Sequence, residues 1–243
     1  MSAAGSSSNT GAARKVIVAI DGPSGAGKST LARHLAQHFG LLNLETGAMY
    51  RAFGLKALRS HCPLDDPEAL EILSADTTIH LEPGEAENRV FLDGEDVTGQ
   101  LRNQIVSDAA SRVSVYPAIR AWMVRLQQQM GESGGIVMEG RDIGTVVFPN
   151  AEVKIFLDAA AEVRGMRRYE QLGQTGRKPD VQPEEVIREL RERDHRDRNR
   201  ADSPLRPAPD SVLLDSTDMT LEEAVQAAEA IVESRLAATQ GNS

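Results

Sequence analysis

The chain has 243 residues, of which 40% are hydrophobic, so it can form one substantial core with room for a subdomain. Its net charge of −9 at pH 7 disfavours a general nucleic-acid-binding surface. The single Cys62 excludes an intramolecular disulfide and suits a reducing compartment, and no apolar run approaches a membrane span in length. We therefore expect a cytoplasmic protein that binds neither a membrane nor a nucleic-acid polymer.

The two ends of the chain are expected to be unstructured, with one folded core between them. Residues 1–14 are rich in Ser, Ala and Gly and predict a disordered leader. Residues 237–243 predict a frayed tail. Residues 15–236 alternate strand-like and helix-like segments, a pattern typical of an α/β fold in which helices cover both faces of a parallel sheet.

The first element is an apolar run, Val16 to Ile20, which leads into Gly-x-x-x-x-Gly-Lys-Ser and a helix ending near Phe39. This context is typical of a phosphate-binding P-loop for a nucleoside triphosphate. Glycines let backbone N–H groups approach phosphate oxygens, Lys28 adds a positive charge, and the Ser29 hydroxyl is placed to bind Mg²⁺. The predicted loop comprises Gly22, Pro23, Ser24, Gly25, Ala26, Gly27, Lys28, Ser29 and Thr30.

The segments after the P-loop change character twice. A short strand at 41–44 precedes a helix that runs to about Arg59, with Thr46 as its expected N-cap. A short helix is expected at 67–73. Residues 77–98 are rich in β-formers, with turn residues at 82–88 and an Asp-Gly turn, and they predict a small antiparallel sheet inserted between helical stretches.

The remaining segments alternate again between the two periodicities. Helices are expected at 103–115, 117–130, 160–172, 183–198 and 221–236, and strands at 136–138, 153–157 and 211–214. Ligands bind at the carboxyl ends of the strands in such sheets. The polar run that follows the strand at 136–138 is therefore a candidate site.

That polar run contains three residues with chemical potential. Arg141 suits an anionic substrate, although a local ion pair between Arg141 and Asp142 would also explain the two residues. Glu139 could orient a metal ion in the manner of a Walker B acid. From one helix after the P-loop, Arg51 could reach a second phosphate.

Six arginines crowd residues 188–200, and two interpretations of them stay open. The usual one is a solvated helix laced with salt bridges. In the other, the arginines close on phosphates as part of a lid. Further basic residues flank a glycine-containing loop upstream and favour the lid: Arg164, Arg167, Arg168, Arg177 and Lys178. At 3.6 residues per turn, one face of the helix carries Arg193, Arg196, Asp197 and Arg200.

Five segments together resemble the bacterial cytidylate kinases, and the similarity runs from about Lys15 to Leu236. The second, fourth and fifth segments are more specific than the P-loop. The five are Gly-Pro-Ser-Gly-Ala-Gly-Lys-Ser-Thr (22–30), Thr-Gly-Ala-Met-Tyr-Arg (46–51), Glu-Gly-Arg-Asp-Ile-Gly-Thr-Val-Val-Phe-Pro (139–149), Lys-Ile-Phe-Leu-Asp-Ala (154–159) and Arg-Asp-x-Arg-Asp-Arg-Asn-Arg (193–200).

The resemblance implies a P-loop kinase with a five-stranded parallel sheet in the order 2-3-1-4-5. Residues 63–102 would form an insert that binds the nucleoside monophosphate, and residues 160–200 would form a short helical lid. The implied reaction moves the γ-phosphoryl group of ATP, with Mg²⁺, to CMP or dCMP and yields ADP with CDP or dCDP. We expect the chain to act as a monomer.

The same resemblance assigns roles to individual residues. Catalysis would rest on Lys28, Arg141, Arg193 and Arg196. The acceptor nucleotide would be contacted by Thr46 and Arg51, with Arg51 and Arg141 on its phosphate, Ser111, Arg120, Asp142 and Arg200 on cytosine, and Arg193 and Asp197 on the sugar. Glu139 stands where the family commonly has Asp, so a direct or a water-mediated contact with Mg²⁺ stays open.

Three other functions fit parts of the sequence. A P-loop kinase of another acceptor, such as AMP, UMP or shikimate, is compatible with the loop, but segments 46–51 and 139–149 argue against it. A regulatory GTPase would need Asn-Lys-x-Asp, which the sequence lacks. A nucleic-acid-binding role for residues 188–200 is disfavoured by the net charge of −9 and by the acidic residues between the arginines.

Overall fold

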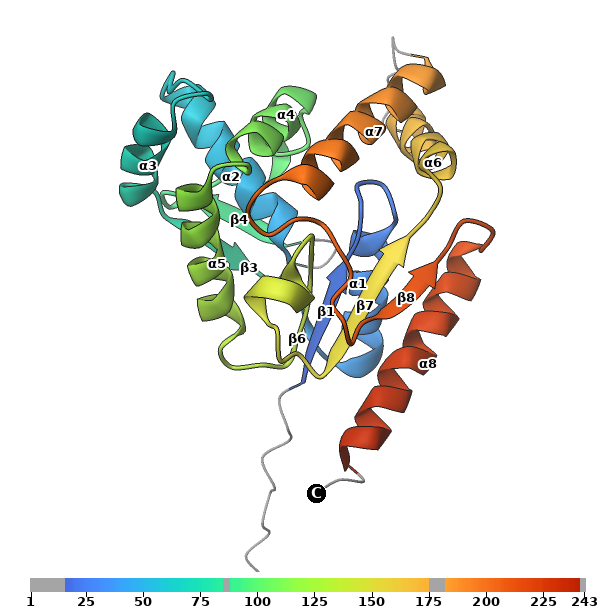
Figure 1. Ribbon diagram of the computed structural model, residues 1–243. Helices are drawn as coiled ribbons and strands as arrows, with labels where there is room; N and C mark the ends of the chain where they lie inside the picture. The colour runs from blue at the N-terminus through green and yellow to red at the C-terminus, as the bar shows by residue number, and fades with distance from the viewer. Residues whose placement is uncertain (1–15, 85–87, 175–181, 241–243) are drawn as a thin grey trace, which may run out of the picture.

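The computed structural model describes residues 16–84, 88–174 and 182–240 (Figure 1). The expected leader at 1–14 lies outside the described residues, as do residues 85–87 of the expected turn. Arg177 and Lys178 and the last three residues, 241–243, also lie outside them.

The centre of the molecule is a five-stranded parallel sheet in the order β2-β6-β1-β7-β8. Its strands are β1 (Ile17–Asp21), β2 (Leu42–Glu45), β6 (Ile136–Gly140), β7 (Val153–Asp158) and β8 (Val212–Asp215). Numbered among themselves, these strands run 2-3-1-4-5, so the predicted order is confirmed. The central strands β1 and β6 are nearly continuous apolar runs because helices cover both of their faces.

Two helix layers bury the two faces of this sheet. Successive side chains of β1 alternate between them: Val18 and Ile20 join one core cluster and Ala19 joins the other. On the first face lie α1 (Lys28–Phe39) and α8 (Leu221–Gln240), and on the second lie α2 (Thr46–Arg59) and α5 (Pro117–Gly131). The predicted two-sided α/β architecture is therefore confirmed.

The last helix, α8, is longer than predicted. It continues to Gln240, whereas the sequence pattern ends at Leu236 and a frayed tail was expected over 237–243. Ala237 and Ala238 explain the difference, because alanine has the highest intrinsic helix propensity and needs no packing partner.

The β-rich insert forms a second, three-stranded antiparallel sheet. Asp93 and Gly94 have φ of 51° and 83°, which two-residue hairpin turns require, so the predicted Asp-Gly turn is confirmed. The insert comprises α3 (Pro67–Ala75), β3 (Ile79–Glu82), β4 (Arg89–Leu92), β5 (Glu95–Asp96) and the short η1 (Thr98–Gln100), and it is followed by α4 (Gln104–Val113).

Two further helices, α6 (Ala161–Gln174) and α7 (Pro183–Asn199), pack together beyond the carboxyl ends of β1 and β7 (Figure 1). Gly165 lets them approach closely, because a Cβ atom there would lie 2.3 Å from Cγ1 of Ile187. The arginine-rich segment is thus held over the carboxyl edge of the sheet, facing the P-loop.

Two local features differ from expectation. Thr46 is the first residue of α2 and not its N-cap, because its hydroxyl donates to the carbonyl oxygen of Glu139 at 2.8 Å instead of capping the helix. After β6 the chain forms a π-helical turn, η2 (Ile143–Val147), which the sequence pattern does not predict. No helix in the described ranges is long and apolar enough to cross a membrane.

Candidate active site

The P-loop joins β1 to α1 with a backbone that only glycine adopts easily. Gly25 and Gly27 have φ of 78° and 95°, in the left-handed region. At Gly22 a Cβ atom would lie 2.0 Å from the carbonyl oxygen of Leu157 on β7. The loop is therefore pressed against the sheet, and the free N–H groups at the start of α1 make it suited to an anion.

Lys28 is the first residue of α1, and its side-chain nitrogen is buried. Nζ donates to the carbonyl oxygen of Pro23 at 2.8 Å and lies 4.0 Å from Oε2 of Glu139. Burial and the positive charge of Arg141 lower the pKa of Lys28 to about 7, against the opposing effect of Glu139. The amine is thus poised to gain a proton when a negative ligand approaches.

Ser29 and Glu139 bring two oxygen donors together beside Lys28. The Ser29 hydroxyl donates to Oε1 of Glu139 at 2.8 Å. Hydroxyl and carboxylate oxygens are the hard donors that Mg²⁺ prefers, so the residues fit this ion. Within the described residues no group of three or more His, Cys, Asp or Glu side chains could hold a metal. The rest of the coordination shell would have to come from water and phosphate oxygens.

Thr46 and Arg51 lie at the start of α2, next to the insert. Arg51 donates through Nη2 to Oε1 of Glu45, the last residue of β2. A small pocket opens beside them between α2, β4 and η1. Its lining residues are Glu45, Ala48, Arg51, Asn88, Val90, Thr98, Leu101 and Arg102. The two arginines give this pocket a basic wall next to the insert.

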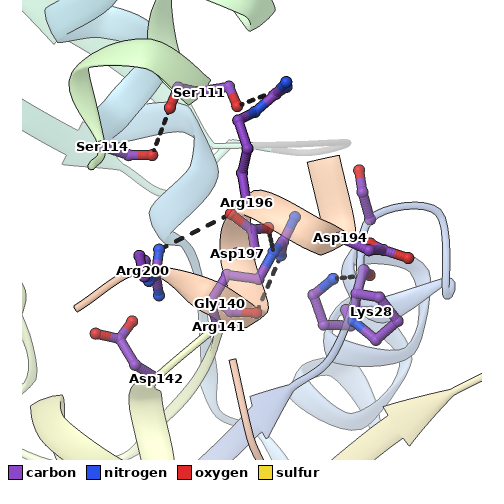
Figure 2. A network of polar contacts seen from close by, with 12 residues as sticks. Lys28, Ser111, Ser114, Gly140, Arg141, Asp142, Asp194, Arg196, Asp197 and Arg200 are labelled. Atoms are coloured by element: carbon purple, nitrogen blue, oxygen red, sulfur yellow. Dashed lines mark hydrogen bonds and ion pairs between the residues drawn. The ribbon is translucent and has the colours of Figure 1, made fainter. Parts of the chain in front are cut away.

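Arg141 connects the end of β6 to α7. Its Nε donates to Oδ2 of Asp197 at 2.9 Å, and its Nη1 donates to the carbonyl oxygen of Gly140 at 3.1 Å (Figure 2). Burial alone would raise the pKa of Asp197, but the charges of Arg141 and Arg193 hold it below its ordinary value. Burial and the charge of Arg141 lower the pKa of Arg193 to about 10. The positive charges of Arg141 and Arg193 therefore exceed the negative charge of Asp197 in this part of the site.

A second cluster lies between α4, α5 and the end of α7. Arg120 of α5 pairs through Nη2 with Oδ2 of Asp142, and both side chains are buried. The Nη1 of Arg200 lies 3.9 Å from Oδ1 of Asp197. Arg196 reaches across to α4, where its Nη2 donates to Oγ of Ser111 at 3.4 Å (Figure 2). The structure thus brings Ser111, Arg120, Asp142, Asp197 and Arg200 to one region.

The site residues predicted from sequence therefore fall into three neighbouring groups. The P-loop and Glu139 form the first group. In the second group, Asp197 links Arg141 and Arg193 to the cluster of Ser111, Arg120, Asp142 and Arg200. Thr46 and Arg51 form the third, on the insert side. Arg51 still lies near enough to Arg193 for its charge to contribute to the lowered pKa of that arginine.

Two acids at the site, Asp21 and Asp194, were not predicted, and Arg164 was expected only in the basic group that favours a lid. The Arg164 side chain donates to Ser24 O at 2.8 Å and to Oδ2 of Asp194 at 2.6 Å, so it ties the P-loop to α7. Asp21 is buried at the end of β1, and burial raises its pKa to about 7 against two backbone hydrogen bonds. For Asp21, the available signal was an acidic residue ending an otherwise apolar strand.

Comparison with known proteins decides the family. The family model for cytidylate kinase matches residues 18–234. The chain belongs to the cytidylate kinase family. A cytidylate kinase from Actinobacillus succinogenes is 47% identical over 229 residues, which cover 91% of this chain and 100% of the relative. One from Syntrophotalea carbinolica is 48% identical over 213 residues, covering 88% and 90% of the two chains.

Likeness among solved structures is weaker. A gluconokinase from Sinorhizobium meliloti matches with a TM-score of 0.46 and 15% identity, covering 94% of this chain and 95% of that one. Such a score carries no argument about the acceptor. The match to the cytidylate kinase family, in contrast, covers nearly the whole chain, and it does not favour another acceptor such as AMP or UMP.

Proposed function

We propose that this chain transfers the γ-phosphoryl group of ATP to CMP or dCMP, yielding ADP and CDP or dCDP. The observation that carries the proposal is that two regions with different polar side chains meet at the end of β6. Glu139 faces Lys28 of the P-loop, and Arg141 and Asp142 face the arginine and acid clusters of α5 and α7. Two nucleotides that exchange a phosphoryl group must bind side by side, and these two neighbouring regions allow that. The family match covers both regions.

In the proposed reaction, a phosphate oxygen of CMP attacks the γ-phosphorus of ATP. A new O–P bond forms, the bond from γ-phosphorus to the β,γ-bridging oxygen breaks, and ADP leaves with that electron pair. The attacking oxygen is already anionic, so no general base is needed. The difficulty is the repulsion between two polyanions, which Lys28, Arg141, Arg193 and Arg196 would offset while stabilising the transferring group.

Mg²⁺ would be held by Ser29 and, directly or through water, by Glu139, whose oxygens already lie together. When bound, the ion supplies positive charge that neutralises phosphate oxygens. The protein's own contribution is to keep the two donors next to Lys28. Arg51 and Arg141 would hold the acceptor phosphate, and Arg193 and Asp197 the sugar.

Base recognition would rest on the second cluster. The exocyclic amino group of cytosine is a donor, which a carboxylate such as Asp142 accepts. Ser111, Arg120 and Arg200 would complete the contacts. Uracil carries a carbonyl at that position, so UMP would leave buried polar groups without partners, which costs binding free energy.

A coupled assay of ADP release tests this proposal across CMP, dCMP, UMP and AMP. We expect turnover with CMP or dCMP at kcat/KM values at least about tenfold above those for UMP and AMP, because unpaired buried polar groups penalise the wrong base. A preference for AMP would contradict the assignment of the acceptor site.

The lowered pKa of Lys28 predicts a proton exchange on binding. The triphosphate's negative charge should raise this pKa again, so ATP binding at about pH 8 should take up about one proton. Because the bound state holds the extra proton, ATP affinity should fall as pH rises above the free pKa of about 7. Isothermal titration calorimetry in buffers of different ionisation enthalpy measures the uptake.

Lys28→Arg is the matched control for that experiment. Arginine stays protonated at every accessible pH, so the enthalpy of ATP binding to this variant should no longer depend on the ionisation enthalpy of the buffer. A wild-type binding enthalpy that is the same in all buffers would show that Lys28 is already charged in the free protein and would contradict the prediction.

We also propose that the protein acts as a monomer in the cytoplasm. All three groups of site residues come from one chain, so no second copy is needed to complete them. The free thiol of Cys62 suits a reducing compartment. Light scattering coupled to size-exclusion chromatography, which would give a mass near 26.3 kDa for a monomer, measures the oligomeric state.

A further inference from the structure

Asp21 is a buried acid for which the proposed reaction has no role. It ends β1 and is 4% exposed. Its backbone is fixed on both sides, by pairing with Gly140 of β6 and with Phe156 of β7. The next residue, Gly22, is pressed against β7, so the end of this strand has no freedom to shift.

Both carboxylate oxygens of Asp21 are bound to the turn that follows β6. Oδ1 accepts from the backbone N–H of Ile143 and Oδ2 from that of Gly144, each at 2.7 Å. These two donors open η2, directly after Arg141 and Asp142. The carboxylate therefore grips the chain one residue beyond the acceptor-facing pair.

Close packing around the turn means that it has few other conformations if the two hydrogen bonds to Asp21 are lost. At Gly140 a Cβ atom would lie 2.7 Å from Cδ1 of Ile143, and at Gly144 it would lie 3.1 Å from Cδ of Lys154. The backbone at Asp142 has φ −149° and ψ 23°, outside the regular helix and strand regions. An irregular backbone at a functional residue persists only where its surroundings fix it.

We propose that Asp21 is a positioning residue that fixes the start of η2 and thereby holds Arg141 and Asp142 in the arrangement that binds the nucleoside monophosphate. The identity of that ligand rests on the proposed function. One strand thus serves both substrates: β1 delivers the P-loop through its backbone and sets the acceptor residues through its last side chain.

Asp21→Asn tests the proposal, because an amide has one acceptor oxygen and would turn an NH₂ group toward a donor N–H. We expect the KM for CMP to rise by about tenfold or more, since small displacements of positioning groups are costly. The KM for ATP should stay within about twofold, and the preference for CMP over UMP should narrow as Asp142 shifts.

Asp210→Asn is the matched control. Asp210 pairs with Nζ of Lys154 at 2.8 Å, and the Lys154 side chain packs on Gly144, yet Asp210 makes no hydrogen bond to the turn among those recorded for the described residues. It undergoes the same carboxylate-to-amide change, on the partner of a lysine whose side chain packs against the same turn. Its KM values for CMP and ATP should remain those of the wild type.

Hydrogen exchange of the Ile143 and Gly144 amides tests the hold without any substrate. Exchange should be faster in Asp21→Asn than in the wild type and unchanged in Asp210→Asn. Unchanged exchange in Asp21→Asn, or equal increases in the KM for CMP and ATP, would overturn the proposal. If the wild type fails to phosphorylate CMP, the proposed function fails, while amide exchange still decides the role of Asp21. Asp21→Ser replaces the asparagine variant if that one does not fold.

Discussion

A Lys28→Met variant should lose phosphoryl transfer, with kcat at least about 1000-fold lower, because a charge aimed at the reacting phosphates is removed. Lys28 Nζ donates to Pro23 O at 2.8 Å, and no other lysine or arginine is proposed for the P-loop. The fold should survive, since methionine fills a similar volume and removes a buried charge. Coupled ADP release and a thermal melt measure the two properties.

Lys154→Met is the control for that variant. Lys154 is also a buried lysine of the core, but its Nζ pairs with Asp210 and Pro149 O, away from the P-loop. Asp210 is 60% exposed, so water can solvate it once Lys154 is removed, and kcat should stay within about twofold. Wild-type kcat in Lys28→Met would show that the P-loop cation has no part in the reaction.

Arg141→Ala should mainly damage use of the monophosphate. We expect kcat/KM for CMP to fall by about 100-fold or more, because a charge-assisted contact to phosphate is lost together with the hydrogen bond that Arg141 donates to Asp197. The KM for ATP should change much less, since Lys28 and the P-loop remain in place. Steady-state kinetics with each substrate varied in turn separate the two effects.

Arg59→Ala is the control for Arg141→Ala. Arg59 is an exposed arginine of α2 that pairs with Glu95 at 2.8 Å on the insert. Exposed ion pairs contribute about 1 kcal/mol or less, so neither KM should move. CMP kinetics at wild-type values in Arg141→Ala would mean that Arg141 does not contact the acceptor.

The order of elements could be predicted because local patterns carry it. The apolar run before Gly22 and the turn at Asp93-Gly94 each require a particular backbone, and the structure has both. The alternation of strands and helices then leaves few topologies for a parallel sheet. The strand order itself came from the resemblance to a family, not from the residue pattern.

Contacts between residues far apart in sequence could not be predicted in the same way. Asp21 and Ile143 are 122 positions apart and meet only because β1 and β6 are neighbours that end together. The hydroxyl of Thr46, expected to cap its own helix, instead finds a carbonyl oxygen 93 positions away. Local propensity assigns such side chains a nearby partner, and tertiary packing supplies a different one.

Each of the two interpretations of the arginine-rich helix describes a different side of α7. Arg191 and Arg198 are 59% and 51% exposed and pair with acids at the surface. Asp194 and Asp197 are buried and face Arg164 and Arg141. The helical period predicted the inward position of Asp197 but not that of Asp194. Closure of the arginines on phosphates stays a prediction.

The crowding of arginines has a consequence for how this protein can be altered. At this site, polar atoms of four arginines are buried without a hydrogen-bond partner among the described residues: Arg51 Nε, Arg120 Nε, Arg193 Nε and Arg200 Nη2. Each such atom lowers the stability of the free protein. Substitutions that replace these arginines to raise the thermal stability of the protein would also remove groups suited to binding its anionic substrates. Thermal stability and turnover therefore cannot both be maximised at this site.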